Sequence, residues 1–319
     1  MKRITLVLFV LLISLSCSSE KKNDEIRPEI PVPDKHKIGY SLSVNSFNDD
    51  KLSYVKSVGV DYVEASGITS FFDSNGYINK TEEELEDIFT KAKATLDRNE
   101  ISVWSVHMAY GEKVDISAVS ESQRREIVDN HVKLLKYIKL LKPKFILFHP
   151  SYYIEPNQRD KHISQLIKSL EVLNEEVKKA GSTLVVENML GPELMKGDVE
   201  RPLMRTVEET RDVFNRLPKD IGLAVDMNHI KNPENLIRAM GNKLMTVHVA
   251  DGSGEAENHY MPNPCSNQGK NDWVEIFKAL YDVGYDGVFL YESTKFEDEK
   301  EFKECYDKLF QNYVNHINK

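Results

Sequence analysis

The stretch TLVVEN, residues 183 to 188, sets three aliphatic residues directly before an acidic one. Leu184, Val185 and Val186 form the short, partly β-branched run that predicts a buried strand. Glu187 ends this run, and a buried carboxylate costs several kcal/mol unless it is paired or neutralised. The stretch therefore predicts a core strand whose final side chain meets a cation or another partner.

Similar runs recur along the chain after residue 36, and stretches of helical period separate them. This alternation is typical of βα units on a parallel sheet. We expect eight strands, at residues 37–43, 60–66, 101–107, 144–150, 183–188, 221–226, 244–251 and 286–293. Eight such units predict an α/β fold, a (β/α)8 TIM barrel, with residues 37–319 as one domain. A doubly wound sheet is the alternative, but the sequence lacks the glycine-rich phosphate loop that often accompanies it.

In a TIM barrel the active site lies where the strands end and the βα loops begin. Seven metal-competent side chains stand at or just after the predicted strand ends: His107, His149, Glu187, Asp226, His229, His248 and Glu292. A single histidine in such a place is often only a hydrogen-bonding residue, but an acid that closes a hydrophobic strand is usually either neutralised or paired with a cation. We therefore predict one divalent ion, bound by Glu187, Asp226, His248 and Glu292. This oxygen-rich set suits Mn²⁺ best, with Mg²⁺, Co²⁺ and Zn²⁺ as alternatives.

These strand ends resemble those of the sugar phosphate isomerase/epimerase family. This family consists of xylose isomerase-like TIM barrels of the AP endonuclease family 2 superfamily and includes the ketose 3-epimerases. The resemblance covers roughly residues 37 to 295. It implies the same four ligands, and it implies that Glu187 and Glu292 are also the catalytic pair. One glutamate would remove a carbon-bound proton and the other would return it.

Further motifs extend the resemblance to substrate contacts. The motif DMNH, residues 226 to 229, gives His229 a substrate-oxygen role, and Glu193 matches a second glutamate six residues after the first. His259, in HYMP, falls in the family's loop after strand seven. One position departs from the pattern: the ketose 3-epimerases carry an arginine six residues after the strand-seven histidine, where this chain has Gly254.

Other residues near the strand ends are candidate substrate contacts. We expect His107 and His149 to bind substrate oxygens, and we expect the Trp104 ring to stack on a sugar. An equally simple interpretation places the Trp104 ring in the packing of the barrel. Glu64, at the end of the second strand, either contacts substrate or forms a structural ion pair.

The predicted function is a metal-dependent sugar isomerase or epimerase that acts by proton transfer through an enediolate. Because the N-terminus, residues 1–16, reads as an export signal, we expect an unphosphorylated sugar. A metal-dependent lyase or dehydratase that acts on 3-keto-glycosides or inososes is the close alternative. A second alternative is a three-zinc phosphodiesterase like endonuclease IV, in which His107, His149, Glu257 and His259 would supply additional ligands. A third is a sugar-binding protein without turnover.

The N-terminus, MKRITLVLFVLLISLSC, has a basic start, an apolar run and small residues before Cys17. Residues 1–16 therefore read as a signal peptide. The ending SLSC resembles a bacterial lipobox, which predicts that Cys17 is lipidated, although Ser14 stands where leucine is commonest. Residues 17–36 then form a flexible tether. We expect a lipoprotein of the cell envelope, on the periplasmic or outer-membrane face, and simple secretion remains the alternative.

Charge and cysteine content bound the partners. The formal charge is −9, and removal of Lys2 and Arg3 with the signal peptide makes it −11. Because nucleic acid binding needs a positive field, we expect no nucleic acid partner. We expect a small carbohydrate as the partner and membrane contact only through the lipid, and the sequence is compatible with a homo-oligomer. Cys265 and Cys305 either pair or remain two free thiols.

Overall fold

The computed structural model describes residues 31–319. The predicted signal peptide, the lipidation site at Cys17 and the tether up to residue 30 lie outside the described residues. Residues 34–36 already contact the barrel domain. The Asp34 carbonyl accepts a hydrogen bond from the Tyr281 hydroxyl at 2.9 Å, Lys35 pairs with Asp307, and the His36 ring stacks on Tyr281 with ring centres 5.0 Å apart. The ordered contacts therefore begin three residues before the predicted domain boundary. Among residues 31–319, no helix combines the length and the apolar character that a membrane crossing requires.

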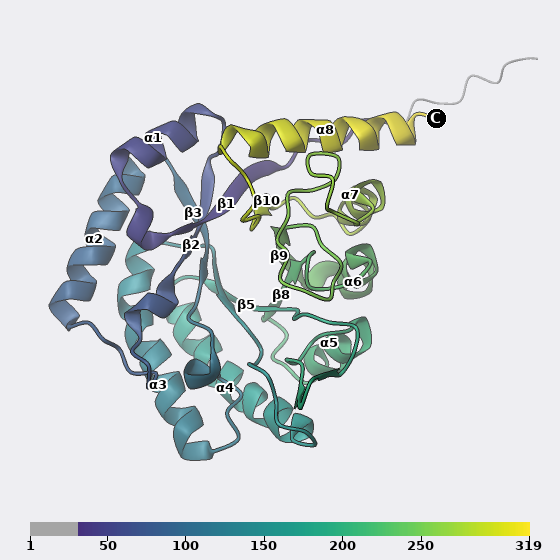
Figure 1. Ribbon diagram of the computed structural model, residues 1–319. Coiled ribbons are helices and arrows are strands. Elements are labelled where there is room, and N and C mark those ends of the chain that lie inside the picture. The colour runs from purple at the N-terminus through teal and green to yellow at the C-terminus, as the bar shows by residue number, and fades with distance from the viewer. Residues whose placement is uncertain (1–30) are drawn as a thin grey trace, which may run out of the picture. The chain divides into compact units, whose positions relative to one another are not determined.

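Eight parallel strands close into a barrel (Figure 1). The order around the barrel is β1-β10-β9-β8-β5-β4-β3-β2. Their bounds are β1 Lys37–Ser43, β2 Tyr62–Ser66, β3 Ser102–His107, β4 Phe145–Phe148, β5 Thr183–Glu187, β8 Gly222–Asp226, β9 Leu244–Val249 and β10 Val288–Tyr291. All eight lie inside the predicted ranges, so the (β/α)8 fold is confirmed. A short antiparallel hairpin, β6 Met195–Lys196 with β7 Val199–Glu200, was not predicted.

Helices surround the strands on the outside of the barrel (Figure 1). They are α1 Asp49–Ser57, α2 Glu82–Arg98, α3 Glu121–Ile138, α4 Arg159–Lys179, α5 Val207–Phe214, α6 Pro233–Met240, α7 Trp273–Asp282 and α8 Lys300–Ile317. Several start at side chains that satisfy the free amides of the first turn. Thr81 and Glu84 form a full capping box at α2, and Asp272 accepts from two amides at α7. These caps fix where each helix begins and therefore how long the βα loops are.

The barrel interior is filled by side chains in layers below the strand ends. The interior cluster consists of Trp104, Phe145, Leu147, Val185, Ala224, Val288 and Leu290. Because the barrel is packed here, chemistry has to take place above this layer, at the carboxyl ends of the strands. A larger cluster joins the outer faces of the strands to the surrounding helices.

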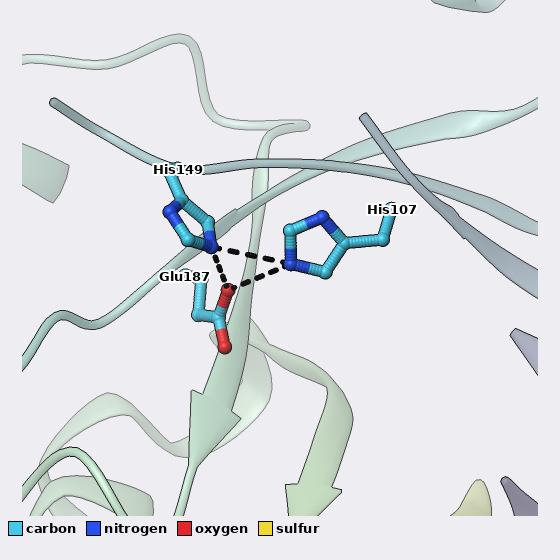
Figure 2. Close-up of side chains that lie close together, drawn as sticks. All are labelled: His107, His149 and Glu187. Atoms are coloured by element: carbon cyan, nitrogen blue, oxygen red, sulfur yellow. Dashed lines mark hydrogen bonds and ion pairs between the residues drawn. The ribbon is translucent and has the colours of Figure 1, made fainter. Parts of the chain in front are cut away.

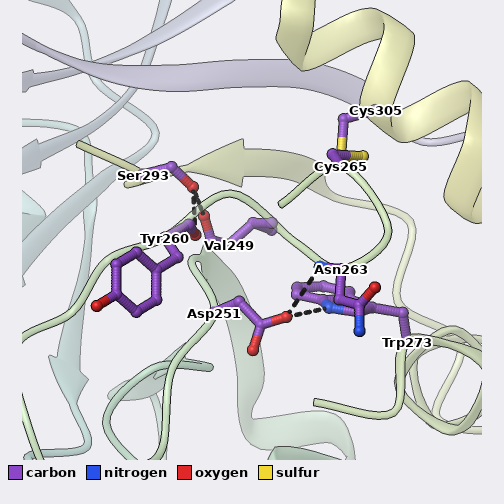
Figure 3. The surroundings of a disulfide bond; sticks show 8 residues. All are labelled: Val249, Asp251, Tyr260, Asn263, Cys265, Trp273, Ser293 and Cys305. Atoms are coloured by element: carbon purple, nitrogen blue, oxygen red, sulfur yellow. Dashed lines mark hydrogen bonds between the residues drawn. A yellow bond between two sulfur atoms is a disulfide. The ribbon is translucent and has the colours of Figure 1, made fainter. Parts of the chain in front are cut away.

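The loop between β9 and α7 is held by a buried acid and a disulfide (Figure 3). Asp251 accepts hydrogen bonds from the Trp273 indole at 2.7 Å and from the Asn263 amide at 3.1 Å. Cys265 and Cys305 form a disulfide, which settles the alternative that the sequence leaves open. The disulfide ties this loop to α8.

Candidate active site

Four neighbouring strands deliver the predicted metal ligands to one point. Glu187 and Asp226 are the last residues of β5 and β8, His248 lies in β9, and Glu292 directly follows β10. Since β5, β8, β9 and β10 are consecutive around the barrel, the four side chains form an arc at its mouth. One ligand atom from each residue lies within 4.8 Å of the others. We call these residues the four-ligand group.

The His248 ring is the centre of this group. Its Nδ1 atom lies 2.9 Å from Glu187 Oε1, 2.8 Å from Glu292 Oε2 and 4.0 Å from Asp226 Oδ2. Burial lowers the pKa of His248, but the charges of Glu292, Glu64 and Glu187 outweigh burial and raise it well above its ordinary value. In the metal-free protein a proton on His248 thus compensates the acids, in the place where a divalent ion would do so.

The carboxylates of the four-ligand group fit a cation. Glu187 Oε2, Asp226 Oδ2 and Glu292 Oε2 are buried and receive no well-aligned hydrogen bond from the described residues, although histidine ring nitrogens lie 3.1 Å, 3.6 Å and 2.8 Å away. Buried oxygens without a well-aligned donor are rare in folded proteins and indicate a missing ion or water. Burial raises the pKa of Asp226 to about 7. A divalent ion would remove this penalty, so the residues present fit the predicted metal.

His107 and His149 form a second group with Glu187 (Figure 2). Their Nε2 atoms lie 3.2 Å apart and converge on Glu187 Oε2, at 3.6 Å from His107 and 3.1 Å from His149. Burial alone would lower the pKa of His107, but Glu187 and other nearby acids raise it to about 9. Burial lowers the pKa of His149. The opposite directions of these two pKa shifts fit one proton between the two Nε2 atoms.

A third group forms on the other side, around Glu257. The Nε2 atoms of His229 and His259 lie 3.2 Å and 3.0 Å from Glu257 Oε2. Asp226 joins this group, because its Oδ2 lies 3.6 Å from His229 Nε2. Glu187 and Asp226 thus each belong to two groups, and the three groups are contiguous. From the sequence, Glu257 was predicted to be a ligand only in the phosphodiesterase alternative.

Backbone carbonyls orient three of the histidines. The Nδ1–H groups of His107, His229 and His259 donate to the carbonyls of Met108, Asn188 and Glu292 at 3.0 Å each. These bonds leave each Nε2 free to face the cluster, which is how histidines that bind metals or substrates are usually held.

Two adjoining cavities open above the three groups. One has a volume of about 450 Å³ and the other about 370 Å³, and they share His107, Tyr110, Glu292 and Thr294. This volume lies in the range of small-molecule sites. Tyr110 is half exposed and stacks on His149 with ring centres 4.6 Å apart, so its free face is open to a ligand. None of the residues of the described barrel that line these cavities is a lysine or an arginine.

Two predicted substrate contacts do not join the cluster. Trp104 is 7% exposed in the interior layer, where its indole N–H donates to Thr246 Oγ1 at 2.9 Å, so the predicted stacking on substrate is wrong. Trp104 stands three residues before the end of β3, too deep in the barrel to reach its mouth. Glu193 is exposed on the loop before β6, and no described contact connects it to the three groups.

The chain belongs to the xylose isomerase-like TIM barrel family, whose model matches residues 52–309. It is 26% identical over 167 residues to an uncharacterized protein of Methanocaldococcus jannaschii, MJ1614; the match covers 52% of this chain and 62% of that protein. It is 22% identical over 232 residues to a second uncharacterized protein of the same organism, MJ1311. That match covers 70% of this chain and 73% of MJ1311.

Several solved structures share the fold. A D-tagatose 3-epimerase-like protein superposes with a TM-score of 0.69 at 19% identity, covering 88% of this chain and 99% of that one. The 3-keto-D-glucoside 4-epimerase YcjR from E. coli gives 0.65 at 18% identity, covering 87% and 100%. An L-ribulose 3-epimerase gives 0.65 at 16% identity, covering 88% and 95%. At these identities the comparisons establish the barrel fold.

Proposed function

We propose that the chain is a metal-dependent sugar isomerase or epimerase that moves a proton through an enediolate of its substrate. The observation that carries this proposal is the four-ligand group, in which three buried carboxylates and one imidazole converge at the mouth of a barrel. The names of the three solved structures, all sugar epimerases or similar to one, support the proposal. Mn²⁺ is the ion we propose, with Mg²⁺, Co²⁺ or Zn²⁺ as substitutes.

When bound, the ion would polarise a substrate carbonyl and acidify the adjacent carbon-bound proton. Glu187 and Glu292 would hold the ion together with Asp226 and His248. Because β5 and β10 are separated by two strands, Glu187 and Glu292 enter the cluster from different sides. One of them removes the proton and the other returns it to the opposite face or to the neighbouring carbon. The first outcome is epimerisation and the second is isomerisation.

The lining of the cavities supports a neutral sugar as substrate. Proteins usually hold phosphate groups with arginine, lysine or a helix N-terminus. The two cavities above the donor groups are lined by neither lysine nor arginine, while His107, His149, His229 and His259 offer hydrogen bonds to hydroxyl groups. We therefore propose an unphosphorylated sugar.

Elimination by a lyase is the close alternative, and the conformation of the β9–α7 loop supports it. Gly254 stands at the position where the ketose 3-epimerases carry an arginine, and its φ is +75°. A Cβ at this position would lie 2.7 Å from the Lys231 amide nitrogen. The loop thus has no room for an arginine here, which argues against a substrate bound in the manner of a ketose 3-epimerase.

A label-uptake experiment tests the proposal. The Mn²⁺-loaded protein is incubated in deuterated water with a panel of ketoses, 3-keto-glycosides and inososes, and products are followed by NMR. We expect deuterium at a carbon next to the carbonyl of at least one substrate. Release of a leaving group would assign the lyase. Absence of label from the whole panel would contradict the proposal and would favour a binding protein.

The second candidate function is a three-metal phosphodiesterase. The observation that favours it is the presence of three contiguous groups of possible metal ligands. A single ion would need only one of these groups. Three zinc ions would then activate water against a phosphate. Metal counting on purified protein together with a chromogenic phosphodiester separates the two candidates. Three zinc ions per chain with hydrolysis would establish the phosphodiesterase, whereas one ion without hydrolysis would exclude it.

We further propose that the mature chain is anchored to the cell envelope through Cys17. The support is the apolar N-terminal run and the SLSC ending. Incorporation of labelled palmitate into the wild-type chain, and its loss in Cys17→Ala, would be the expected result. Labelling of both or of neither would contradict lipidation at Cys17.

A further inference from the structure

Glu64 is a buried acid that the proposed reaction does not use. It lies in β2 and is 0% exposed. Its Oε2 accepts hydrogen bonds from Ser105 Oγ at 2.8 Å and from His248 Nε2 at 3.0 Å. Its other oxygen, Oε1, is buried without a hydrogen-bond partner among the described residues. An acid in such surroundings is costly, so its place in the barrel requires a reason.

The reason lies in its contact with His248. The ring of His248 joins Glu64 on one side to the four-ligand group on the other, because Nε2 faces Glu64 while Nδ1 faces Glu187 and Glu292. If Nε2 carries the proton that it donates to Glu64, the lone pair of Nδ1 points at the position of the ion. Carboxylates that accept from the outer nitrogen of a ligating histidine fix its orientation and increase its basicity.

His248 also differs from the neighbouring site histidines. Backbone carbonyls orient His107, His229 and His259, whereas a side chain orients His248. His248 also uses Nδ1 toward the cluster, where these three use Nε2. A substitution can remove a side-chain partner but not a backbone carbonyl. Of these four histidines, His248 is therefore the one whose orienting hydrogen bond a single substitution at Glu64 would remove.

We infer that Glu64 is a positioning residue, which holds His248 with Nδ1 toward the ion and thereby sets the metal affinity of the four-ligand group. This inference rests on the proposed metal-dependent function. Glu64 is not a member of the four-ligand group. It acts through the imidazole ring of His248.

The test measures metal affinity and not turnover. Mn²⁺ is titrated calorimetrically into metal-free wild type, Glu64→Gln and the control Glu200→Gln. Glu200 is another buried glutamate, whose Oε2 pairs with Arg159 at 3.6 Å, and it lies outside the cluster. We expect Glu64→Gln to weaken Mn²⁺ binding by about 10- to 100-fold, the usual effect of removing such a partner. Glu200→Gln should stay within about twofold of wild type. An affinity of Glu64→Gln within that margin would overturn the inference.

A second measurement does not depend on a Glu64 variant. Nitrogen-15 NMR of the Zn²⁺-loaded wild type, with His248 assigned by comparison with His248→Gln, reports which ring nitrogen carries the proton. We expect a proton on Nε2, and a proton on Nδ1 would overturn the inference. If the four-ligand group binds Mn²⁺ but no substrate takes up label, the proposed function fails and the inference stands. If that group binds no Mn²⁺, the inference is overturned.

Discussion

His107 Nε2 and His149 Nε2 lie 3.2 Å apart, and both face Glu187 Oε2. Two imidazole nitrogens at this distance share one proton or one ligand, because two N–H groups would repel each other. The opposite pKa shifts of the pair, to about 9 for His107 and downward for His149, agree with one shared proton. The pair thus offers a donor and an acceptor beside a proposed catalytic carboxylate.

The pair therefore matters for substrate binding. We expect His149→Gln to lower kcat/KM by about 10- to 100-fold, the cost of a lost hydrogen bond to a substrate oxygen. Metal content should remain at one ion per chain, measured by plasma emission after dialysis. A drop in metal content that parallels the loss of activity would instead assign His149 as a ligand and would support the phosphodiesterase.

Substitutions of Trp104 and Tyr110 should have different effects, because Trp104 packs in the barrel interior and Tyr110 faces the cavity. Trp104→Phe removes the indole hydrogen bond to Thr246, so we expect unfolding in urea to become easier by about 1 kcal/mol while KM stays unchanged. Tyr110→Ala removes an exposed ring at the cavity, so we expect a higher KM and little change in stability. Equal effects of the two substitutions on KM would restore the predicted role of Trp104.

His131 should make the fold sensitive to acid. It is fully buried between Phe72 and Phe148, and burial lowers its pKa from 6.5 to about 4. Because the folded form binds the proton less readily than the unfolded chain, the contribution of His131 is complete above pH 6.5 and is lost as the pH falls toward 4. Between about pH 7.5 and about pH 4.5, wild type should lose roughly 2 to 3 kcal/mol more stability than His131→Phe. Parallel pH profiles of the two proteins in urea unfolding would refute this assignment.

The disulfide should stabilise the barrel. Cys265 and Cys305 are 40 residues apart, and closing a loop of this length lowers the entropy of the unfolded chain by an amount worth roughly 4 kcal/mol. The double variant Cys265→Ala, Cys305→Ala should therefore unfold at lower urea concentration. A reducing agent should lower the midpoint of wild type and leave that of the variant unchanged. A midpoint of wild type that does not respond to reduction would show that the crosslink contributes little.

The strand ends could be predicted from sequence because their signal is local. In Thr183–Glu187 a run of buried aliphatic residues and the acid that closes it are adjacent in the chain, and the barrel geometry then brings such ends together. Trp104 was misplaced because proximity to a strand end does not determine in which interior layer a side chain packs. The partner of Glu64 could not be derived, since its contact with His248 joins residues 184 positions apart.

The paths of the long βα loops could not be predicted from the sequence either. Glu193 was placed near the site through its spacing from Glu187, but the chain between them leaves the barrel and continues into the β6–β7 hairpin. No hydrophobic period marks such a path. The pairing of Cys265 with Cys305 likewise depends on how the β9–α7 loop meets α8.

The central claim is that Glu187 and Glu292 transfer a substrate proton beside a bound ion. The most direct test follows solvent deuterium into the carbon next to the carbonyl in Mn²⁺-loaded wild type, Glu187→Gln and Glu292→Gln, with bound metal measured in each sample. We predict label uptake in wild type and a loss of at least about 100-fold in each variant that retains the ion. Uptake at the wild-type rate in either metal-loaded variant would contradict the two-glutamate account.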